Sequence, residues 1–248
     1  MSILRRSLWL VLLVVFSFPV NMVRAMTAEE IINYRDDNEH FQSARVEGEM
    51  LVVSGGREMT KSMISLVDGD DALAEFTNPH DRGTKFLKRG EDLYLFFPDA
   101  EDIIKISGHM MNQGMMGSDY SYRDVMESER LTDLYEFTIL GEEEVDSRLC
   151  YKLEGIAREG EEVSYYRRIT WVDKERFIGL REELYAQSGR LLKEYYVTDV
   201  EEIQGRWYPM QAVMENKLRR DTRTVFTMLD IEFDPEIPAG IFALERLR

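Results

Sequence analysis

The stretch Arg45-Val-Glu-Gly-Glu-Met-Leu-Val-Val53 indicates the kind of fold that this chain of 248 residues adopts. Polar and apolar side chains alternate along it: Arg45, Glu47 and Glu49 are polar, and Val46, Met50 and Val52 are apolar. A period of two is typical of a β-strand with one buried face and one wet face. The stretch therefore predicts a strand of an antiparallel sheet.

Turn signals and further strand patterns follow at short intervals. Gly55-Gly56 separates the first strand from residues 59–67, and Asp68-Gly-Asp70 separates those from residues 72–77. Gly and Asp pairs are preferred in tight hairpin turns. The series of hairpins continues with short strands at residues 84–88, 93–97 and 103–106.

The second half of the chain repeats this spacing of about 8 to 14 residues between turn signals. Strands are predicted at residues 134–140, 150–156, 165–172, 178–185, 191–200, 210–216 and 222–233, with turns at Gly141, Gly155 to Gly160, Asp173-Lys174, Ser188-Gly189 and Gly205. In the last strand, the alternation places Val225, Leu229, Ile231 and Phe233 on one face. The pattern describes one long antiparallel meander, which can relieve its exposed edges by curling strongly.

The helical period is confined to a few segments. Thr27-Ala-Glu-Glu30 is a capping box that predicts a helix to about His40, and residues 241–247 suit a short C-terminal helix. No alternation of strands with helices indicates parallel βαβ units. Pattern alone thus predicts a curved antiparallel sheet with a few helices, in one domain.

Leu93-Tyr-Leu-Phe-Phe97 has apolar residues in both of its alternating sets. A strand that is apolar on both sides must be covered on both. We therefore expect another segment of the chain to pack against this strand.

The stretch from Gly114 to Val125 joins a Met-rich loop to the start of a helix. Ser118 or Asp119 can cap a helix at residues 118–130, which then carries apolar side chains at i, i+3 and i+4 spacing, namely Tyr122, Val125 and Met126. A loop capped into a short helix is the simple interpretation. A gate over an apolar ligand is the functional one, because methionines adapt to irregular partners.

Residues 1–25 have the features of an export signal. Arg5 and Arg6 give a positive start, Leu8 to Phe18 an apolar core, and Val23-Arg-Ala25 a small-residue cleavage site. A membrane span needs about 20 apolar residues, which is more than this core provides. We expect a cleaved signal peptide at 1–25 and an exported single domain at 26–248, with an uncleaved signal anchor as the alternative.

The charge of the chain excludes some classes of partner. The formal net charge is −16, from 31 basic and 47 acidic side chains. Loss of the first 25 residues, which hold Arg5, Arg6 and Arg24 and no acid, makes it −19. Such a surface argues against nucleic acid as a partner and against tight adsorption to anionic lipid head groups.

The sequence offers no recognisable catalytic set, so we expect no enzyme activity and no cofactor. None of His40, His80 and His109 belongs to an H-x-x-x-H or H-E-x-x-H pair, and no G-x-S-x-G or S-x-x-K motif is present. Cys150 lies in an alternating strand and is expected to be a buried, inert thiol. The acidic pairs Glu161-Glu162 and Glu182-Glu183 are most simply solvated faces or turns.

A copper site is the alternative to the apolar gate in the Met-rich segment. His109, Met110, Met111, Met115 and Met116 lie within eight residues, and thioethers with an imidazole suit Cu(I). No second His or Met cluster supports such a site, so no metal is predicted. Absence of competition in a Cu(I) titration would end this alternative.

Five segments together resemble the outer membrane lipoprotein-sorting proteins of the LolA-like superfamily. They are Met116-Gly-Ser-Asp-Tyr-Ser-Tyr122, Tyr166 to Asp173 with its Trp-Val-Asp, Gly189-Arg-Leu-Leu-Lys193, Gly205-Arg-Trp-Tyr-Pro209 and Thr222-Arg-Thr224. The resemblance implies a mainly β (α+β) fold, in which a strongly curved, unclosed antiparallel sheet (a half-barrel) with a few covering helices surrounds an apolar interior. It supplies no catalytic residue.

In the carriers LolA and LolB of this superfamily, the interior receives the acyl chains of lipoproteins on their way to the outer membrane. The resemblance therefore implies a periplasmic carrier or chaperone for a lipoprotein or another lipid. Its partners would be an inner-membrane exporter of the resistance-nodulation type and an outer-membrane acceptor. The residues expected to form the cavity or gate are Leu93, Leu95, Phe97, Met115, Met116, Tyr120, Tyr122, Tyr135, Phe137 and Ile139.

Two other functions remain open at this point. The same fold can serve as a non-catalytic accessory module of an envelope lipid-export complex, for which we expect a filled interior. A hydrolase would require dispersed acids to converge in a deep cleft. A connected apolar cavity favours the carrier.

Overall fold

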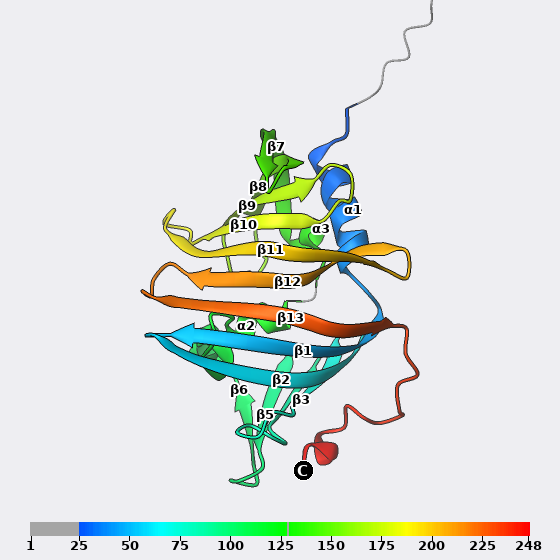
Figure 1. Ribbon diagram of the computed structural model, residues 1–248, viewed down its shortest axis with the longest axis vertical. Helices are drawn as coiled ribbons and strands as arrows, with labels where there is room; N and C mark the ends of the chain where they lie inside the picture. The colour runs from blue at the N-terminus through cyan, green and yellow to red at the C-terminus, as the bar shows by residue number, and fades with distance from the viewer. Residues whose placement is uncertain (1–24, 128) are drawn as a thin grey trace, which may run out of the picture.

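The computed structural model describes residues 25–127 and 129–248, so the expected export signal lies, except for Ala25, outside the described residues. The described chain forms an antiparallel sheet of 13 strands (Figure 1). The sheet is curved and is not closed, because its edges are two different strands, β6 and β7. The predicted fold class is confirmed.

The first half of the sheet is a series of hairpins. Along β1, every second residue from Ala44 to Val52 is buried, which is the alternation that the sequence predicted. The strands of this half are β1 (Ser43–Ser54), β2 (Arg57–Asp68), β3 (Asp71–Phe76), β4 (Lys85–Arg89), β5 (Asp92–Phe97) and β6 (Asp102–Ile106).

The second half is another meander, and it starts at the opposite edge. Its strands are β7 (Tyr135–Val145), β8 (Arg148–Ala157), β9 (Arg167–Asp173), β10 (Gly179–Tyr185), β11 (Leu191–Ile203), β12 (Arg206–Asn216) and β13 (Thr222–Phe233). The last of these, β13, pairs with β1. The sheet thus consists of two meanders, and the first strand of one (β1) pairs with the last strand of the other (β13). The sequence predicted one continuous meander instead.

A bulge in β13 changes which of its side chains point inward. In the pairing with β1, Glu47 faces Asp230 and Gly48 faces Met228, so Leu229 is an extra residue. Leu229 is 56% exposed, whereas Ile231 is 6% exposed. The prediction that Leu229 shares a face with Ile231 is therefore wrong, because one added residue reverses the alternation.

A second bulge replaces a predicted turn. Gly141, with φ of 153°, lies inside β7, whose register against β8 shifts between Ile139 and Gly141. The strand therefore continues to Val145. Since β7 is an edge strand, the bulge falls where irregular pairing is common.

The helices and 3₁₀ turns are short and lie between or beside the meanders. They are α1 (Ala28–Glu39), α2 (Tyr122–Met126) and α3 (Leu131–Leu134), with 3₁₀ turns η1 (Gly108–Asn112), η2 (Met115–Gly117) and η3 (Leu244–Leu247). The capping box of α1 is confirmed: the Thr27 hydroxyl accepts from Glu30 N at 3.2 Å, and the Glu30 carboxylate accepts from Thr27 N at 2.7 Å. Ile31 and Ile32 of α1 pack against α3 and the β7 end of the sheet.

The helix predicted at residues 118–130 is wrong in its cap and its length. Ser121 is the N-cap of α2: its hydroxyl accepts from Asp124 N at 3.2 Å, and the Asp124 carboxylate accepts from Ser121 N at 2.6 Å. Ser118 and Asp119 make other bonds, described below. The helix ends at Met126 because Glu127 is extended.

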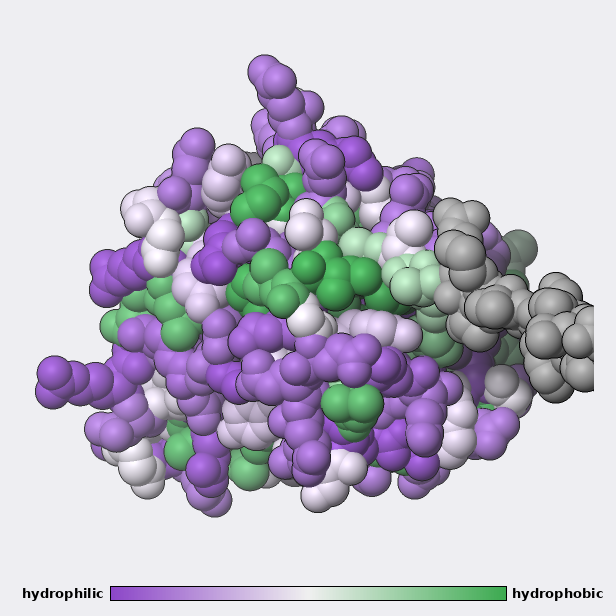
Figure 2. Space-filling view, turned by 90° about the horizontal axis from the view of Figure 1, so that it is seen from above, coloured by the Kyte–Doolittle hydropathy of each residue, from purple (hydrophilic) through white to green (hydrophobic). Residues whose placement is uncertain are grey.

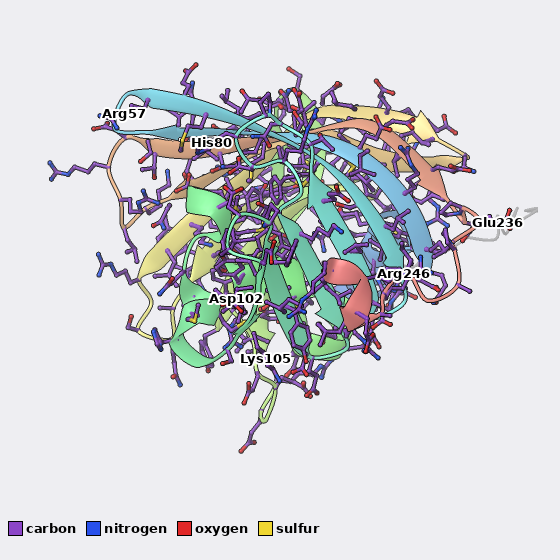
Figure 3. All side chains as sticks on the ribbon, turned by 90° about the horizontal axis from the view of Figure 1, so that it is seen from below. Arg57, His80, Asp102, Lys105, Glu236 and Arg246 are labelled. Atoms are coloured by element: carbon purple, nitrogen blue, oxygen red, sulfur yellow. The ribbon has the colours of Figure 1, made fainter. Side chains whose placement is uncertain are left out.

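The C-terminal segment covers the outer side of β5, as the apolar pattern of this strand predicted. Leu93, Leu95 and Phe97 belong to the inner cluster, whereas Tyr94 and Phe96 pack with Leu87, Phe242, Leu244 and Leu247 on the outer side. Figure 3 shows the segment around Arg246 lying against these strands. The Arg246 carbonyl accepts from Lys85 Nζ at 3.3 Å.

Most of the surface seen from the β7 end is hydrophilic, with small groups of hydrophobic side chains (Figure 2). Ile139, Leu140 and Leu149 are among the exposed apolar residues of β7 and β8. Among the residues that the structure describes, no helix is both long enough and apolar enough to cross a membrane.

Candidate functional site

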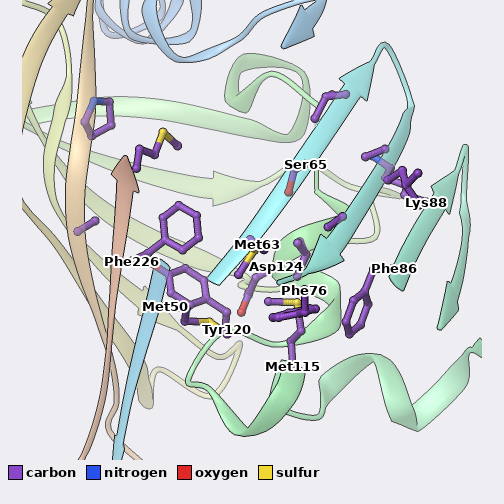
Figure 4. Close-up of a pocket in the computed structure, with 18 of the residues that line it drawn as sticks. Met50, Met63, Ser65, Phe76, Phe86, Lys88, Met115, Tyr120, Asp124 and Phe226 are labelled. Carbon is purple, nitrogen blue, oxygen red and sulfur yellow. The ribbon is translucent and has the colours of Figure 1, made fainter. Parts of the chain in front are cut away.

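A cavity of about 530 Å³ lies between the inner face of the sheet and the segment 115–125. Figure 4 shows Met115, Tyr120 and Asp124 of this segment opposite Met50 and Phe226 of the sheet. Strands β1 to β5 and β11 to β13 all contribute to its wall, together with the end of α1. The lining residues are Glu39, Met50, Met63, Ser65, Val67, Ala72, Leu73, Ala74, Phe76, Phe86, Lys88, Leu93, Met115, Tyr120, Asp124, Val125, Tyr195, Tyr208, Pro209, Met210, Ala212, Phe226 and Met228.

The wall of the cavity is mainly apolar. Met50, Met63, Phe76, Phe86 and Leu93 belong to one buried cluster. Phe76 and Phe86 meet edge to face, with ring centroids 5.6 Å apart. A volume of this size and an apolar lining with a few polar groups are typical of sites for small apolar ligands.

The structure distributes the predicted cavity and gate residues over three environments. Leu93, Met115 and Tyr120 line the cavity. Their predicted companions Leu95, Phe97, Met116 and Tyr122 pack in the cluster that forms its wall. Tyr135 and Phe137 lie in a different cluster, with α1 and α3, and Ile139 is 38% exposed on the edge strand.

Sequence reasoning missed most of the wall. Met63, Phe86, Phe226 and Tyr208 come from four strands and meet only in the curved sheet. The alternation of polar and apolar residues in β1 and β2 indicated that Met50 and Met63 point to the inner face of the sheet. For Phe226, the bulge in β13 removed the signal.

The segment from Gly114 to Val125 is a closed loop held by its own backbone. Met115 N donates to Tyr120 O at 2.7 Å, and Tyr122 N donates to Gln113 O at 3.1 Å. A Cβ added at Gly114 would lie 2.3 Å from the Ser118 carbonyl oxygen. Alanine at Gly114 would therefore distort the loop, so it is a poor probe of gating.

Asp119 anchors this loop to the sheet. It is 2% exposed, and its carboxylate accepts from the Thr222 hydroxyl at 2.9 Å and from the Thr224 hydroxyl at 3.0 Å. Its backbone N donates to Thr224 Oγ1 at 2.9 Å. The loop is thus tied to β13 through a buried carboxylate, a stronger attachment than its Met and Gly content suggested.

Replacing Thr224 by valine should destabilise the protein by about 2–3 kcal/mol, because a buried carboxylate loses a hydroxyl donor while the shape is kept. Thr227→Val is the matched control. Thr227 lies in the same strand and bonds Gln211 Nε2 at 3.0 Å, away from the loop. Urea unfolding of both variants measures the difference in stability. Equal losses of stability would show that the bonds to Asp119 contribute no more than the bond made by Thr227.

A network of buried charges lies beside the cavity, at the junction of α1 with β9 and β10. Arg35 Nη2 is 2.8 Å from Glu39 Oε2 and 3.1 Å from Glu182 Oε1, and Arg168 Nη1 is 3.7 Å from Glu182 Oε2. Burial opposes the charge of Arg35, yet the carboxylates of Glu39, Glu182 and Asp36 raise its pKa. Burial raises the pKa of Glu39, and Arg35 counteracts that rise. The prediction that Glu182 lies on a solvated face is therefore wrong, because Glu182 is buried with two arginines.

Gly179 allows this network to form. A Cβ there would lie 2.9 Å from Arg35 Nε and 3.5 Å from Glu39 Oε1. The Gly179 amide donates to the same Glu39 oxygen at 2.9 Å. A glycine is needed because the Arg35 guanidinium packs directly on the backbone.

Other chemistry-bearing side chains are placed for packing. Met110, Met111, Met115 and Met116 pack against the inner apolar cluster, whereas His109 is exposed. The described residues contain no group of three or more His, Cys, Asp or Glu that could hold a metal. Cys150 is fully buried, and burial raises the pKa of its thiol to about 11, which fits the inert thiol expected from the sequence.

Comparisons with known proteins agree with this fold. Residues 68–248 match the model of a family described as "Uncharacterized protein", and no curated protein matches the sequence. A DUF1329 family protein from Desulfovibrio piger is 28% identical, with a TM-score of 0.81, over 89% of this chain and 98% of the other.

Two further solved structures are similar. A LolA superfamily protein from Nitrosomonas europaea is 25% identical, with a TM-score of 0.73, over 89% of this chain and 99% of the other. A domain assigned to outer membrane lipoprotein sorting, from Vibrio parahaemolyticus, is 24% identical, with a TM-score of 0.77, over 89% and 97%. This last similarity concerns the fold alone.

Proposed function

We propose that this chain, which belongs to the family whose model matches residues 68–248 and is similar to a LolA superfamily protein, is a lipid carrier. It binds the acyl chain of a lipoprotein or of another lipid in its apolar cavity and transfers it toward the outer membrane. The observation that carries this proposal is the cavity of about 530 Å³ between the inner face of the sheet and the 115–125 segment.

The energetics of the cavity support this role. Burying a methylene contributes about 0.8 kcal/mol, so a chain of about 16 carbons gains on the order of 12 kcal/mol before the costs of ordering are subtracted. Binding then needs no catalytic chemistry. The cavity also favours a carrier over an accessory module, for which we expect a filled interior.

We place the carrier in the periplasm, as a single domain from residue 26 onward that is released from a signal peptide. Its partners would be an inner-membrane exporter that loads it and an outer-membrane acceptor that unloads it. The formal charge of −19 after signal removal disfavours adsorption to anionic membranes, which suits a protein that must leave each membrane again.

Retention of a labelled lipid tests the proposal. Delipidated protein is incubated with a fluorescent phospholipid and separated from vesicles by size exclusion; we expect about one lipid per protein in the protein fraction. Native mass spectrometry of protein purified from its own envelope identifies the natural cargo. Failure to retain any acyl-chain lipid in either experiment would sink the carrier proposal.

A further inference from the structure

The apolar cavity borders a second, more polar one. The second cavity has a volume of about 320 Å³ and shares Glu39, Val67 and Tyr208 with the first. Arg35, Asp36, Glu127, Glu129 and Arg130 are among its other lining residues. A ligand in the apolar cavity therefore meets polar groups at the boundary formed by Glu39 and Tyr208.

Three tyrosines line the apolar cavity, Tyr120, Tyr195 and Tyr208, and the last of them also lines the second cavity. Tyr208 is 7% exposed, and its ring packs on Phe233 with centroids 5.7 Å apart. Within the described residues, none of the three hydroxyls forms a hydrogen bond. Tyrosine hydroxyls inside a protein usually have a partner, and these three open onto the cavity, since none is a fully buried atom.

Two other buried tyrosines, Tyr135 and Tyr165, follow that rule. The Tyr135 hydroxyl donates to Tyr165 O at 2.8 Å, and the Tyr165 hydroxyl donates to Asp124 Oδ1 at 2.6 Å. The three cavity tyrosines thus differ from their neighbours in presenting hydrogen-bonding capacity to a ligand rather than to the protein.

Carboxylates give this end of the cavity its electrostatic character. Burial and then the charge of Glu39 raise the pKa of Tyr208, and burial, Tyr120 and Glu39 raise that of Tyr195. Burial and Asp124 do the same for Tyr120. The hydroxyls therefore stay neutral near pH 7, and Glu39 can still accept a hydrogen bond.

The cations around this end already have anionic or carbonyl partners. Arg35 binds Glu39 and Glu182, and Lys193 Nζ is 2.5 Å from Asp124 Oδ2. Lys88 Nζ donates to Met126 O at 2.9 Å. An anionic head group placed against Tyr195 and Tyr208 would thus lie beside Glu39, whose cation Arg35 is already shared with Glu182, and like charges repel.

We propose that Tyr120, Tyr195, Tyr208 and Glu39 form a head-group subsite that selects an uncharged, hydroxyl-bearing lipid over an anionic one. This inference rests on the carrier function proposed above. A hydroxyl close to the acyl chain can donate to Glu39 and accept from a tyrosine, while the chain lies against Met50, Phe76 and Phe86.

Competition between matched lipids tests the subsite. A pyrene-labelled alkane, which has no head group, reports occupancy of the apolar cavity, and a monoacylglycerol or the fatty acid of the same chain length displaces it at pH 7. We expect the monoacylglycerol to bind roughly 10-fold more tightly than the fatty acid, which is the difference that two hydrogen bonds of about 0.7 kcal/mol each would give.

Adjacent tyrosines of β11 provide a matched pair of variants. Tyr195→Phe should lower the ratio of monoacylglycerol affinity to alkane affinity about 3-fold to 10-fold, because one hydrogen bond is lost and the ring is kept. Tyr196→Phe, whose hydroxyl bonds Glu215 at 3.3 Å on the other face, should change neither. Tyr208→Phe is a second test with the same expectation as Tyr195→Phe.

The outcomes separate the subsite from the carrier function. If the alkane does not bind, the carrier proposal fails and takes the subsite with it. If the alkane binds but the fatty acid competes as well as the monoacylglycerol, the subsite is overturned and the carrier stands. The subsite is likewise overturned if Tyr195→Phe and Tyr208→Phe both bind monoacylglycerol like the wild type.

Discussion

Replacing Ala74 by tryptophan should weaken acyl-chain binding on the order of 100-fold while the protein stays folded. Ala74 lines the cavity from β3 and is only partly buried, so an indole ring can occupy the space that the ligand would fill. Displacing about four methylenes costs about 3 kcal/mol, which corresponds to a loss in affinity on the order of 100-fold. Titration with the pyrene-labelled alkane measures the loss.

The control is Ala100→Trp, in the exposed turn between β5 and β6. This variant adds the same ring outside the cavity and should bind like the wild type. Thermal unfolding should show that Ala74→Trp is about as stable as the wild type, because a side chain that fills an apolar space gains contacts. Undiminished binding by a folded Ala74→Trp protein would place the ligand somewhere other than this cavity.

The strand ladder could be predicted because its signal is local. Alternation in β1 and the Gly and Asp turns that follow β1 and β2 are properties of neighbouring residues, and both are present in the structure. The pairing of β1 with β13 was out of reach, because it joins residues such as Met50 and Phe226 that no local pattern connects. The bulge at Leu229 was hidden for a related reason, since it depends on which strand lies opposite.

The site could be predicted only in part. A two-sided apolar strand at Leu93 to Phe97 indicated cover on both faces, and the structure has an inner cluster on one side and the C-terminal segment on the other. The same pattern cannot tell a packed core from a cavity wall, because both require apolar side chains on the inward face. Hence Leu93 lines the cavity while Leu95, two residues along, packs beside it.

Glu182 and Glu183 show the limit of reading charge from sequence. Adjacent residues of a strand point to opposite faces, so two neighbouring glutamates cannot share one environment. Glu182 is 6% exposed and contacts Arg35 and Arg168, whereas Glu183 lies on the other face with Arg181. Arg35, the partner of Glu182, comes from α1, about 150 residues earlier in the chain. No local pattern in the sequence connects the two residues.

Replacing Glu182 by glutamine should destabilise the protein by about 3–5 kcal/mol, because removing one partner of a buried ion pair leaves an uncompensated charge. Among the described residues, Glu182 is the one residue whose carboxylate oxygen lies within 4.0 Å of a guanidinium nitrogen of Arg168, so its loss leaves that cation unpaired. Glu183→Gln is the matched control from the same strand and should cost within about 1 kcal/mol, since its ion pair is partly exposed. Urea unfolding, followed by circular dichroism, measures both.

A double substitution distinguishes an unpaired charge from simple loss of packing. If the cost of Glu182→Gln arises from the cation left behind on Arg168, then adding Arg168→Met should recover part of the stability, because a methionine of similar length needs no counter-charge. If packing alone were responsible, the second substitution would add a further loss. Equal stability of the Glu182→Gln and Glu183→Gln proteins would mean that water reaches Glu182. The junction of α1 with β10, which borders the proposed head-group subsite, would then be looser than its contacts indicate.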